Sequence, residues 1–136
     1  MIQLKNVSKF YYSKGMIASG ISKINLEFGI GEFVVITGDS GSGKSTLLNV
    51  ISGLDTYEEG EMYINGRETS HYLASDFEEY RKKYIGNIFQ SFNLVNSYTV
   101  YQNIELILRI NGYRKADMKQ RIRSIIKRVG LEAYTG

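Results

Sequence analysis

The stretch Gly38-Asp39-Ser40-Gly41-Ser42-Gly43-Lys44-Ser45 decides how the rest of this chain is interpreted. It matches the spacing G-x-x-x-x-G-K-[ST] of a phosphate-binding loop. An apolar run, Phe33-Val34-Val35-Ile36, precedes it, and a helix-like run from Thr46 to Ile51 follows it. Strand, loop and helix therefore come in the order that such a loop requires. The stretch predicts backbone N–H groups gathered at a helix N-terminus, which is a site for a polyphosphate anion.

The residue types within this loop fit the same chemistry. Glycine has no Cβ, so the backbone can approach a phosphate closely. Lys44 is expected to reach the β- and γ-phosphates of a nucleotide, and the Ser45 hydroxyl is expected to bind Mg²⁺. The alternative is a flexible Gly/Ser connection between a strand and a helix. The order of the flanking elements disfavours that alternative.

The composition is that of an ordinary soluble domain. The chain has 136 residues, 43% hydrophobic and 23% charged, which suits one domain. It has no cysteine, which excludes a disulfide framework and a thiolate zinc site. No apolar run approaches the ~20 residues of a membrane span, and Met1-Ile2-Gln3-Leu4-Lys5 lacks the apolar core of a signal peptide. These features together favour the cytoplasm.

The net charge of +3 is mild, but the basic residues concentrate late in the chain. The late basic residues are Arg109, Arg114, Lys115, Lys119, Arg121, Arg123, Lys127 and Arg128. A solvated basic helix face is the favoured interpretation. Contact with nucleic acid or with acidic lipid headgroups is the alternative. We therefore expect no nucleic-acid partner.

Several short segments have the pattern of β-strands. Alternating apolar residues, among them Leu4 and Leu26, predict strands with one buried face at residues 2–7 and 23–28. The loop between these two strands is expected to hold Tyr11, Tyr12 and Gly15. Further strands are predicted at residues 33–37, 61–64 and 84–89, and a tight turn is predicted at Asn65-Gly66.

Four helices are predicted from apolar spacing and end signals. The helix after the phosphate loop should end at Gly53, because glycine suits the position that follows a helix. The S-x-x-E spacing that begins at Ser75 predicts a helix over about 76–82, and Thr99 with Gln102 forms a second capping box. Asn111-Gly112 should close the helix that Thr99 begins. Apolar residues at helical spacing predict a last helix over 116–129, which Gly130 ends.

Gln90 is the second informative residue. It ends the predicted strand at 84–89 and begins the loop Ser91-Phe92-Asn93-Leu94. Ligand contacts collect where the strands of open α/β sheets end. The amide oxygen of Gln90 could complete a Mg²⁺ shell or hold a water molecule. Without the phosphate loop earlier in the chain, Gln90 would be interpreted as an ordinary polar loop residue.

The order of these motifs resembles the nucleotide-binding subunit of ABC transporters over nearly the whole chain. The motifs that carry the resemblance are Gly38 to Thr46, Leu47-Leu48-Asn49, Gly53-Leu54-Asp55, Gly60-Glu61 and Ile85 to Leu94. The segment Gly86 to Leu94, with Thr99 to Ile104, is similar to one branch of that family. This branch includes the lipoprotein-releasing, macrolide-export and antimicrobial-peptide-resistance transporters.

The resemblance implies an ATP site with Mg²⁺. Tyr11 matches the aromatic residue that stacks on adenine, and Tyr12 could take that role if the register slips by one. The phosphate loop is matched by Gly38, Asp39, Ser40, Gly41, Ser42, Gly43, Lys44, Ser45 and Thr46. Ser45 and Gln90 match the Mg²⁺ contacts. Gln90 also matches the loop that senses nucleotide and touches the membrane subunit.

The resemblance also implies a fold class and a division of the chain. The class is α/β, with a P-loop NTPase core made of a parallel sheet and helices. An N-terminal antiparallel β subdomain and the start of a helical subdomain complete it. Residues 1–32 and 57–70 are expected in the β subdomain, residues 33–56 and 71–92 in the core, and residues 93–136 in the helical subdomain.

The implied activity is that of an ATPase subunit. It would couple Mg-ATP binding and hydrolysis to membrane transport or extrusion. The implied partners are a second ATP-binding subunit, with ATP at the dimer interface, and a transmembrane permease subunit. Through the permease, the protein would lie in the cytoplasm on the inner face of the cell membrane.

The signature loop, the catalytic glutamate and the switch histidine of the family do not occur in this sequence. His71, the one histidine, is expected at the surface. The chain is therefore expected to be the N-terminal part of a domain of roughly 220 residues, and to bind ATP but hardly hydrolyse it alone. Two alternatives stay open: a non-catalytic nucleotide-binding module, and a small P-loop kinase with Arg121 and Arg123 in a lid.

Overall fold

The structure is a computed structural model and describes residues 1–134. The chain divides into two units, Met1–Asn87 and Ile88–Gly136, and each is described separately. This division does not test the finer subdomain boundaries expected from the resemblance, which stay predictions.

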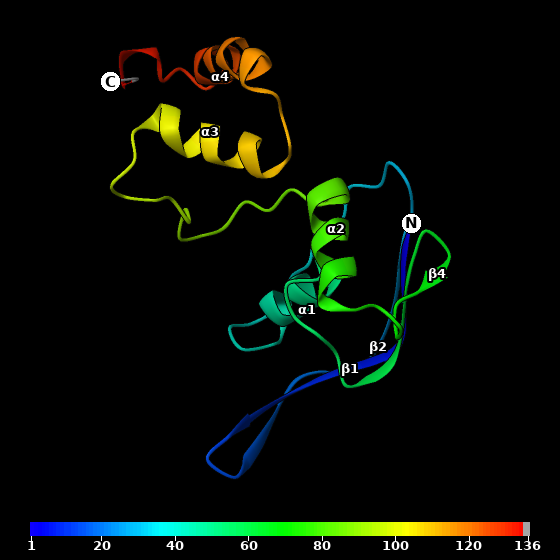
Figure 1. Cartoon of the computed structure of the whole chain (residues 1–136). Coiled ribbons are helices and arrows are strands. Elements are labelled where there is room, and N and C mark those ends of the chain that lie inside the picture. Colours follow the sequence, from blue (N-terminus) through cyan, green and yellow to red (C-terminus); the bar gives the residue numbers. More distant parts are fainter. Residues whose placement is uncertain (135–136) are drawn as a thin grey trace. The chain divides into compact units, whose positions relative to one another are not determined.

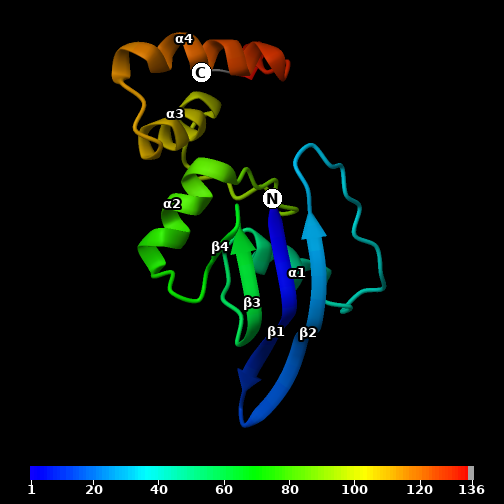
Figure 2. The same cartoon turned by 90° about the vertical axis from the view of Figure 1, so that its right-hand side faces the viewer.

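A four-stranded antiparallel sheet forms the framework of the first unit (Figures 1 and 2). Its strands are β1 (Ile2–Ser13), β2 (Met16–Phe28), β3 (Glu59–Ile64) and β4 (Arg67–Glu68), in the order β2-β1-β3-β4. The tight turn expected at Asn65-Gly66 joins β3 to β4, with positive φ angles of 49° and 79°. The antiparallel β subdomain is thus present.

The long hairpin of β1 and β2 confirms the strands expected at 2–7 and 23–28. It also corrects the expected loop, because Tyr11 and Tyr12 lie within β1 and pair with residues of β2. The chain reverses instead at Lys14-Gly15, where both φ angles are positive, 45° and 79°. The two strands continue past the expected limits because their pairing reaches the turn.

One predicted core position in the hairpin is wrong. Leu4 is 1% exposed, whereas its pairing partner Leu26 is 38% exposed. Partners in an antiparallel ladder share a face, but β2 is an edge strand, whereas β1 has a neighbour on both sides. The described elements therefore cover Leu26 less completely than Leu4.

Two helices pack with the sheet in the first unit. Helix α1 (Lys44–Ile51) ends as predicted, since Gly53 has a φ of 68° directly after the C-cap. Helix α2 (Ala74–Tyr84) is longer than predicted, and its cap differs. The carboxylate of Asp76 accepts a hydrogen bond of 2.7 Å from the backbone N–H of Leu73, so Ser75 does not form the expected cap.

The core of the first unit lies between the sheet and the two helices. Its buried side chains are Leu4, Val7, Ile21, Leu47, Val50, Met62, Ile64 and Tyr80. Leu47 and Val50 come from α1, so the helix that follows the phosphate loop is anchored in this core. Tyr80 of α2 also donates a hydrogen bond of 2.8 Å to the backbone oxygen of Ile51.

Two strand predictions are wrong within the described residues. Residues 33–37 carry no strand, and Phe33 is 93% exposed. Residues 85–89 likewise carry none, and Ile88 is fully exposed. A β-strand needs a partner for its ladder, and no strand of residues 1–134 pairs with either segment. For the same reason, the parallel sheet expected for the core does not occur among these residues.

The second unit is a pair of helices, α3 (Val100–Ile110) and α4 (Lys115–Arg128), followed by the short 3₁₀ helix η1 (Glu132–Tyr134). The capping box predicted at Thr99 and Gln102 is confirmed, and α3 ends at Asn111-Gly112 as expected. The buried residues between α3 and α4 are Leu108, Met118, Ile122 and Ile126. No helix within residues 1–134 is both long and apolar enough to cross a bilayer.

Candidate nucleotide-binding site

The glycine loop at residues 38–43, which is predicted to bind phosphate, leads directly into α1, as the sequence predicts. Lys44, the first residue of the helix, folds its side chain back over the loop. Its ammonium donates hydrogen bonds to the backbone oxygens of Gly38, at 2.7 Å, and Asp39, at 2.6 Å, and to the hydroxyl of Ser42, at 3.3 Å. The cation therefore lies across the loop, where an anion facing the loop would meet it.

Glycine is required at the junction between loop and helix. Gly43 is the N-cap of α1 and has a φ of 91°, a left-handed conformation that costs other residues energy. A Cβ on Gly43 would lie 2.2 Å from the backbone oxygen of Gly20 in β2. Since no side chain fits there, the loop can pack against the hairpin only with glycine at this position.

The N-terminus of α1 is open to an anion. Its N-cap residue Gly43 has no side chain to cap the helix, and the first turn contains no acidic residue. The first backbone N–H groups of a helix lack partners within the helix, and they carry partial positive charge. Ser45 is exposed in this turn, so its hydroxyl is accessible from solvent.

Tyr11 of β1 lies beside this first turn, although 35 residues separate it from Thr46. The Tyr11 hydroxyl lies 3.3 Å from Oγ1 of Thr46 and 3.3 Å from Oδ2 of Asp55, and its single proton can be donated to either. Tyr11 is 41% exposed and Tyr12 is 69% exposed. Successive side chains of a strand point to opposite faces, so Tyr12 does not share the face on which Tyr11 meets Thr46. The stacking role of Tyr11 stays a prediction.

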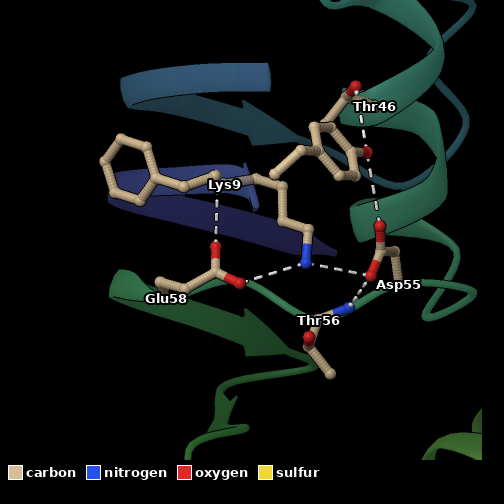
Figure 3. Close-up of polar contacts among 7 residues, drawn as sticks. Lys9, Thr46, Asp55, Thr56 and Glu58 are labelled. Carbon is tan, nitrogen blue, oxygen red and sulfur yellow. Dashed lines mark hydrogen bonds and ion pairs between the residues drawn. The ribbon is translucent and has the colours of Figure 1, made fainter. Parts of the chain in front are cut away.

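A buried lysine beneath Tyr11 was not found by sequence reasoning. Lys9 is 7% exposed, and its ammonium lies 3.1 Å from Asp55 and 3.1 Å from Glu58 (Figure 3). Burial opposes the charge on this ammonium. The carboxylates of Asp55 and Glu58 outweigh burial and raise the pKa of Lys9 above its ordinary value of 10.5. The only sequence signal was a polar residue between apolar ones in a strand, which is too common to be informative.

Gln90 is exposed in a turn of the second unit. Ser45 belongs to the first unit, so the role of Gln90 at Mg²⁺ stays a prediction. His71 is exposed, as expected.

The protein atoms that could serve a metal ion are few. Within the described residues, no three His, Asp or Glu side chains gather to hold a metal ion. The Ser45 hydroxyl is a hard oxygen ligand of the kind that Mg²⁺ accepts, and Mg²⁺ commonly takes its remaining ligands from phosphates and water. The donor set therefore fits a metal that arrives with a nucleotide.

Comparison with known proteins agrees with this geometry. A family model described as "ABC transporter" matches residues 21–135. The methionine import ATP-binding protein MetN of Clostridium acetobutylicum is 38% identical over 131 residues, which are 96% of this chain and 39% of MetN. The macrolide export ATP-binding/permease protein MacB of Campylobacter fetus is 38% identical over 132 residues, which are 97% of this chain and 21% of MacB.

A solved structure matches the fold as well. It is a dimeric, post-hydrolysis state of the ATP-binding cassette MJ0796 of Methanocaldococcus jannaschii, bound to ADP and Pi. The TM-score is 0.89 at 37% identity, over 99% of this chain and 60% of that one. The chain belongs to the ABC transporter family. It spans less than two thirds of the length of each of these relatives, and its fold is a fragment of the ABC ATPase fold.

Proposed function

We propose that this chain is the nucleotide-binding part of an ABC transporter and that it binds ATP together with Mg²⁺. One observation carries the proposal: two different contacts meet at the start of α1. The Lys44 ammonium lies across the glycine loop, and the Tyr11 hydroxyl lies 3.3 Å from Thr46. The first contact suits a polyphosphate and the second suits a flat base, so a nucleotide could engage both.

At the phosphate end, Lys44 would donate to the β- and γ-phosphates. A hydrogen bond between an ammonium and a phosphate oxygen is stronger than one to a neutral carbonyl, so phosphate can compete for the lysine. The N–H groups at the start of α1 would add further donors. Mg²⁺ would neutralise phosphate charge, and Ser45, with Gln90, would supply protein oxygens to it.

At the base end, the Tyr11 ring would stack on adenine. Stacking needs a flat, accessible ring face, and Tyr11 is 41% exposed. Its hydroxyl is tied to Thr46 and Asp55, so the ring is restrained before a base arrives. A restrained ring loses less conformational entropy on binding.

For the whole protein we propose ATP hydrolysis coupled to transport. The cassette MJ0796 is dimeric in its solved structure with ADP and Pi, which supports a second ATP-binding subunit as partner, with ATP at the interface. MacB is named as both ATP-binding and permease protein, which supports a transmembrane permease as the other partner. The permease would hold this protein on the cytoplasmic face of the cell membrane.

Within the family we propose the branch of lipoprotein-releasing, macrolide-export and antimicrobial-peptide-resistance transporters. Overall identity does not distinguish the branches, because MacB and MetN both match this chain at 38%. The proposal therefore rests on the segment Gly86–Leu94. Family membership removes the small kinase alternative. A non-catalytic nucleotide-binding module remains the second candidate, and it would bind Mg-ATP without turning it over.

The test is calorimetric titration of the full-length gene product with Mg-ATP. We expect saturable binding, and we expect Lys44→Ala to weaken it by roughly 10- to 150-fold, the value of one charge-assisted hydrogen bond. Lys82→Ala is the matched control, since Lys82 is an exposed lysine of α2. Equal binding by both variants would refute the proposed site. A second measurement distinguishes the two candidate functions. Release of phosphate by the wild type would support the ATPase, and binding without release would support the non-catalytic module.

A further inference from the structure

Lys9, Asp55 and Glu58 form a charged cluster, the Lys9 cluster, beside the base end of the site. The Lys9 side chain is 8% exposed, and its ammonium lies 3.1 Å from one oxygen of each carboxylate (Figure 3). An ionised lysine away from water is costly unless it is paired. The Lys9 ammonium therefore holds both carboxylates, and it links β1 to the segment that follows α1.

Each carboxylate uses its other oxygen on the strand that carries Tyr11. Oδ2 of Asp55 lies 3.3 Å from the Tyr11 hydroxyl, and Oε2 of Glu58 accepts a hydrogen bond of 2.8 Å from the backbone N–H of Phe10. The Lys9 ammonium also lies 5.4 Å from the centroid of the Tyr11 ring. The Lys9 cluster thus contacts the ring, the hydroxyl and the neighbouring backbone of the tyrosine.

The backbone beyond Asp55 is fixed as well. Oδ1 of Asp55 accepts a hydrogen bond of 2.8 Å from the N–H of Thr56 in addition to its contact with Lys9. Both oxygens of Asp55 are therefore engaged, and its carboxylate has little freedom to rotate. A carboxylate held in this way presents a constant acceptor to the Tyr11 hydroxyl.

We propose that Lys9 and Asp55 are positioning residues for base binding. They hold the Tyr11 ring against Thr46, so that the base platform stays at a fixed place relative to the phosphate loop. This inference rests on the proposed function. It assigns these two residues no contact with the phosphates. Their loss should weaken the binding of a ligand that has a base and spare a ligand that has only phosphates.

The experiment compares two probes, Mg-ATP and inorganic tripolyphosphate with Mg²⁺, on the full-length gene product. Lys9→Met removes the ammonium but keeps an apolar side chain in the buried space. Asp55→Asn removes the charge but keeps the shape. Either variant should free the Tyr11 side chain, which must then be ordered again when the base binds. We expect this cost to lower the ATP affinity by roughly 2- to 12-fold. The affinity for tripolyphosphate should stay at the wild-type value.

Lys5→Met is the matched control. Lys5 lies on the same strand and its ammonium also lies over a tyrosine ring, 4.6 Å from the centroid of Tyr63. It has no part in the Lys9 cluster, so its ATP affinity should be unchanged. Tyr11→Phe is a milder variant, which removes only the hydroxyl. It should lower ATP affinity and spare tripolyphosphate even if Lys9→Met folds poorly.

The outcomes separate the inference from the function beneath it. If the wild type binds neither probe, the proposed function is wrong, and the inference that rests on it is wrong as well. If the wild type binds both but Lys9→Met, Asp55→Asn and Tyr11→Phe all keep wild-type ATP affinity, the positioning role is wrong. An equal loss of both probes in the Lys9 and Asp55 variants would also overturn it, because it would indicate a general structural role.

Discussion

At the phosphate end of the candidate site the contacts are local, whereas at the base end they join distant parts of the chain. Lys44 donates to backbone oxygens only five and six residues before it. Tyr11 instead depends on Thr46 and on the Lys9 cluster, whose members are up to 49 residues apart. The first end is shaped by glycine backbone and the second by buried charge. The two ends should therefore fail separately, under different substitutions.

The largest effect is expected at the junction of loop and helix. Gly43→Ala places a Cβ 2.2 Å from the Gly20 oxygen in a left-handed conformation. The strain and the clash together should lower the free energy of unfolding by about 2–5 kcal/mol, measured by urea denaturation. Gly41→Ala is the control, since Gly41 has a φ of 82° but nothing within 4 Å of a Cβ. It should cost about 1–2 kcal/mol. Equal costs would show that the contact with Gly20 does not matter.

A smaller effect with a distinctive pH dependence is expected in the Lys9 cluster. Near neutral pH, Lys9→Met should lower the free energy of unfolding by about 1.5–3 kcal/mol, because the hydrogen bond from the Lys9 ammonium to the charged Glu58 carboxylate is lost. The raised pKa means that charged Lys9 stabilises the folded state fully below its ordinary value of 10.5. This stabilisation is lost as the pH rises through the raised pKa of the folded state.

The difference between wild type and Lys9→Met should therefore shrink above pH 10.5. Urea denaturation at a series of alkaline pH values measures it. A difference that stays constant across that range would contradict a charged, paired Lys9 and would leave only packing as its role.

The smallest effect is expected in an ion pair of the second unit, which sharpens the contrast with the buried one. Arg114 and Asp117 lie 2.9 Å apart, with side chains 83% and 51% exposed. Exposed pairs contribute little, so Asp117→Asn should change the free energy of unfolding by less than about 1 kcal/mol. Mg-ATP affinity should not change. A loss as large as that of Lys9→Met would mean that burial does not set the strength of these pairs.

The same division between local and distant contacts separates what the sequence predicts from what it does not. Local features could be predicted. The phosphate loop is contained in eight consecutive residues, so its glycines and Lys44 could be recognised without the fold. The helix ends at Gly53 and Thr99 were likewise predicted, because a cap depends on its nearest neighbours.

The contacts that could not be predicted from the sequence join residues that lie far apart along the chain. The segment 33–37 has the composition of a strand, but composition does not supply the partner that a ladder needs. The Lys9 cluster depends on bringing β1 beside residues 55–58. No local pattern shows that Lys9 is buried or that Asp55 will meet Tyr11. The contact forms when the chain folds and places β1 beside the segment that follows α1.

The most direct test of this account titrates two variants of the full-length gene product with two ligands, Mg-ATP and inorganic tripolyphosphate with Mg²⁺. Lys44→Ala should weaken the binding of both ligands by roughly 10- to 150-fold. Tyr11→Ala should weaken only ATP, by about 1–3 kcal/mol, which is the value of stacking one base. If Lys44→Ala spared tripolyphosphate, or if Tyr11→Ala weakened both ligands alike, the separation of a phosphate end from a base end would be contradicted.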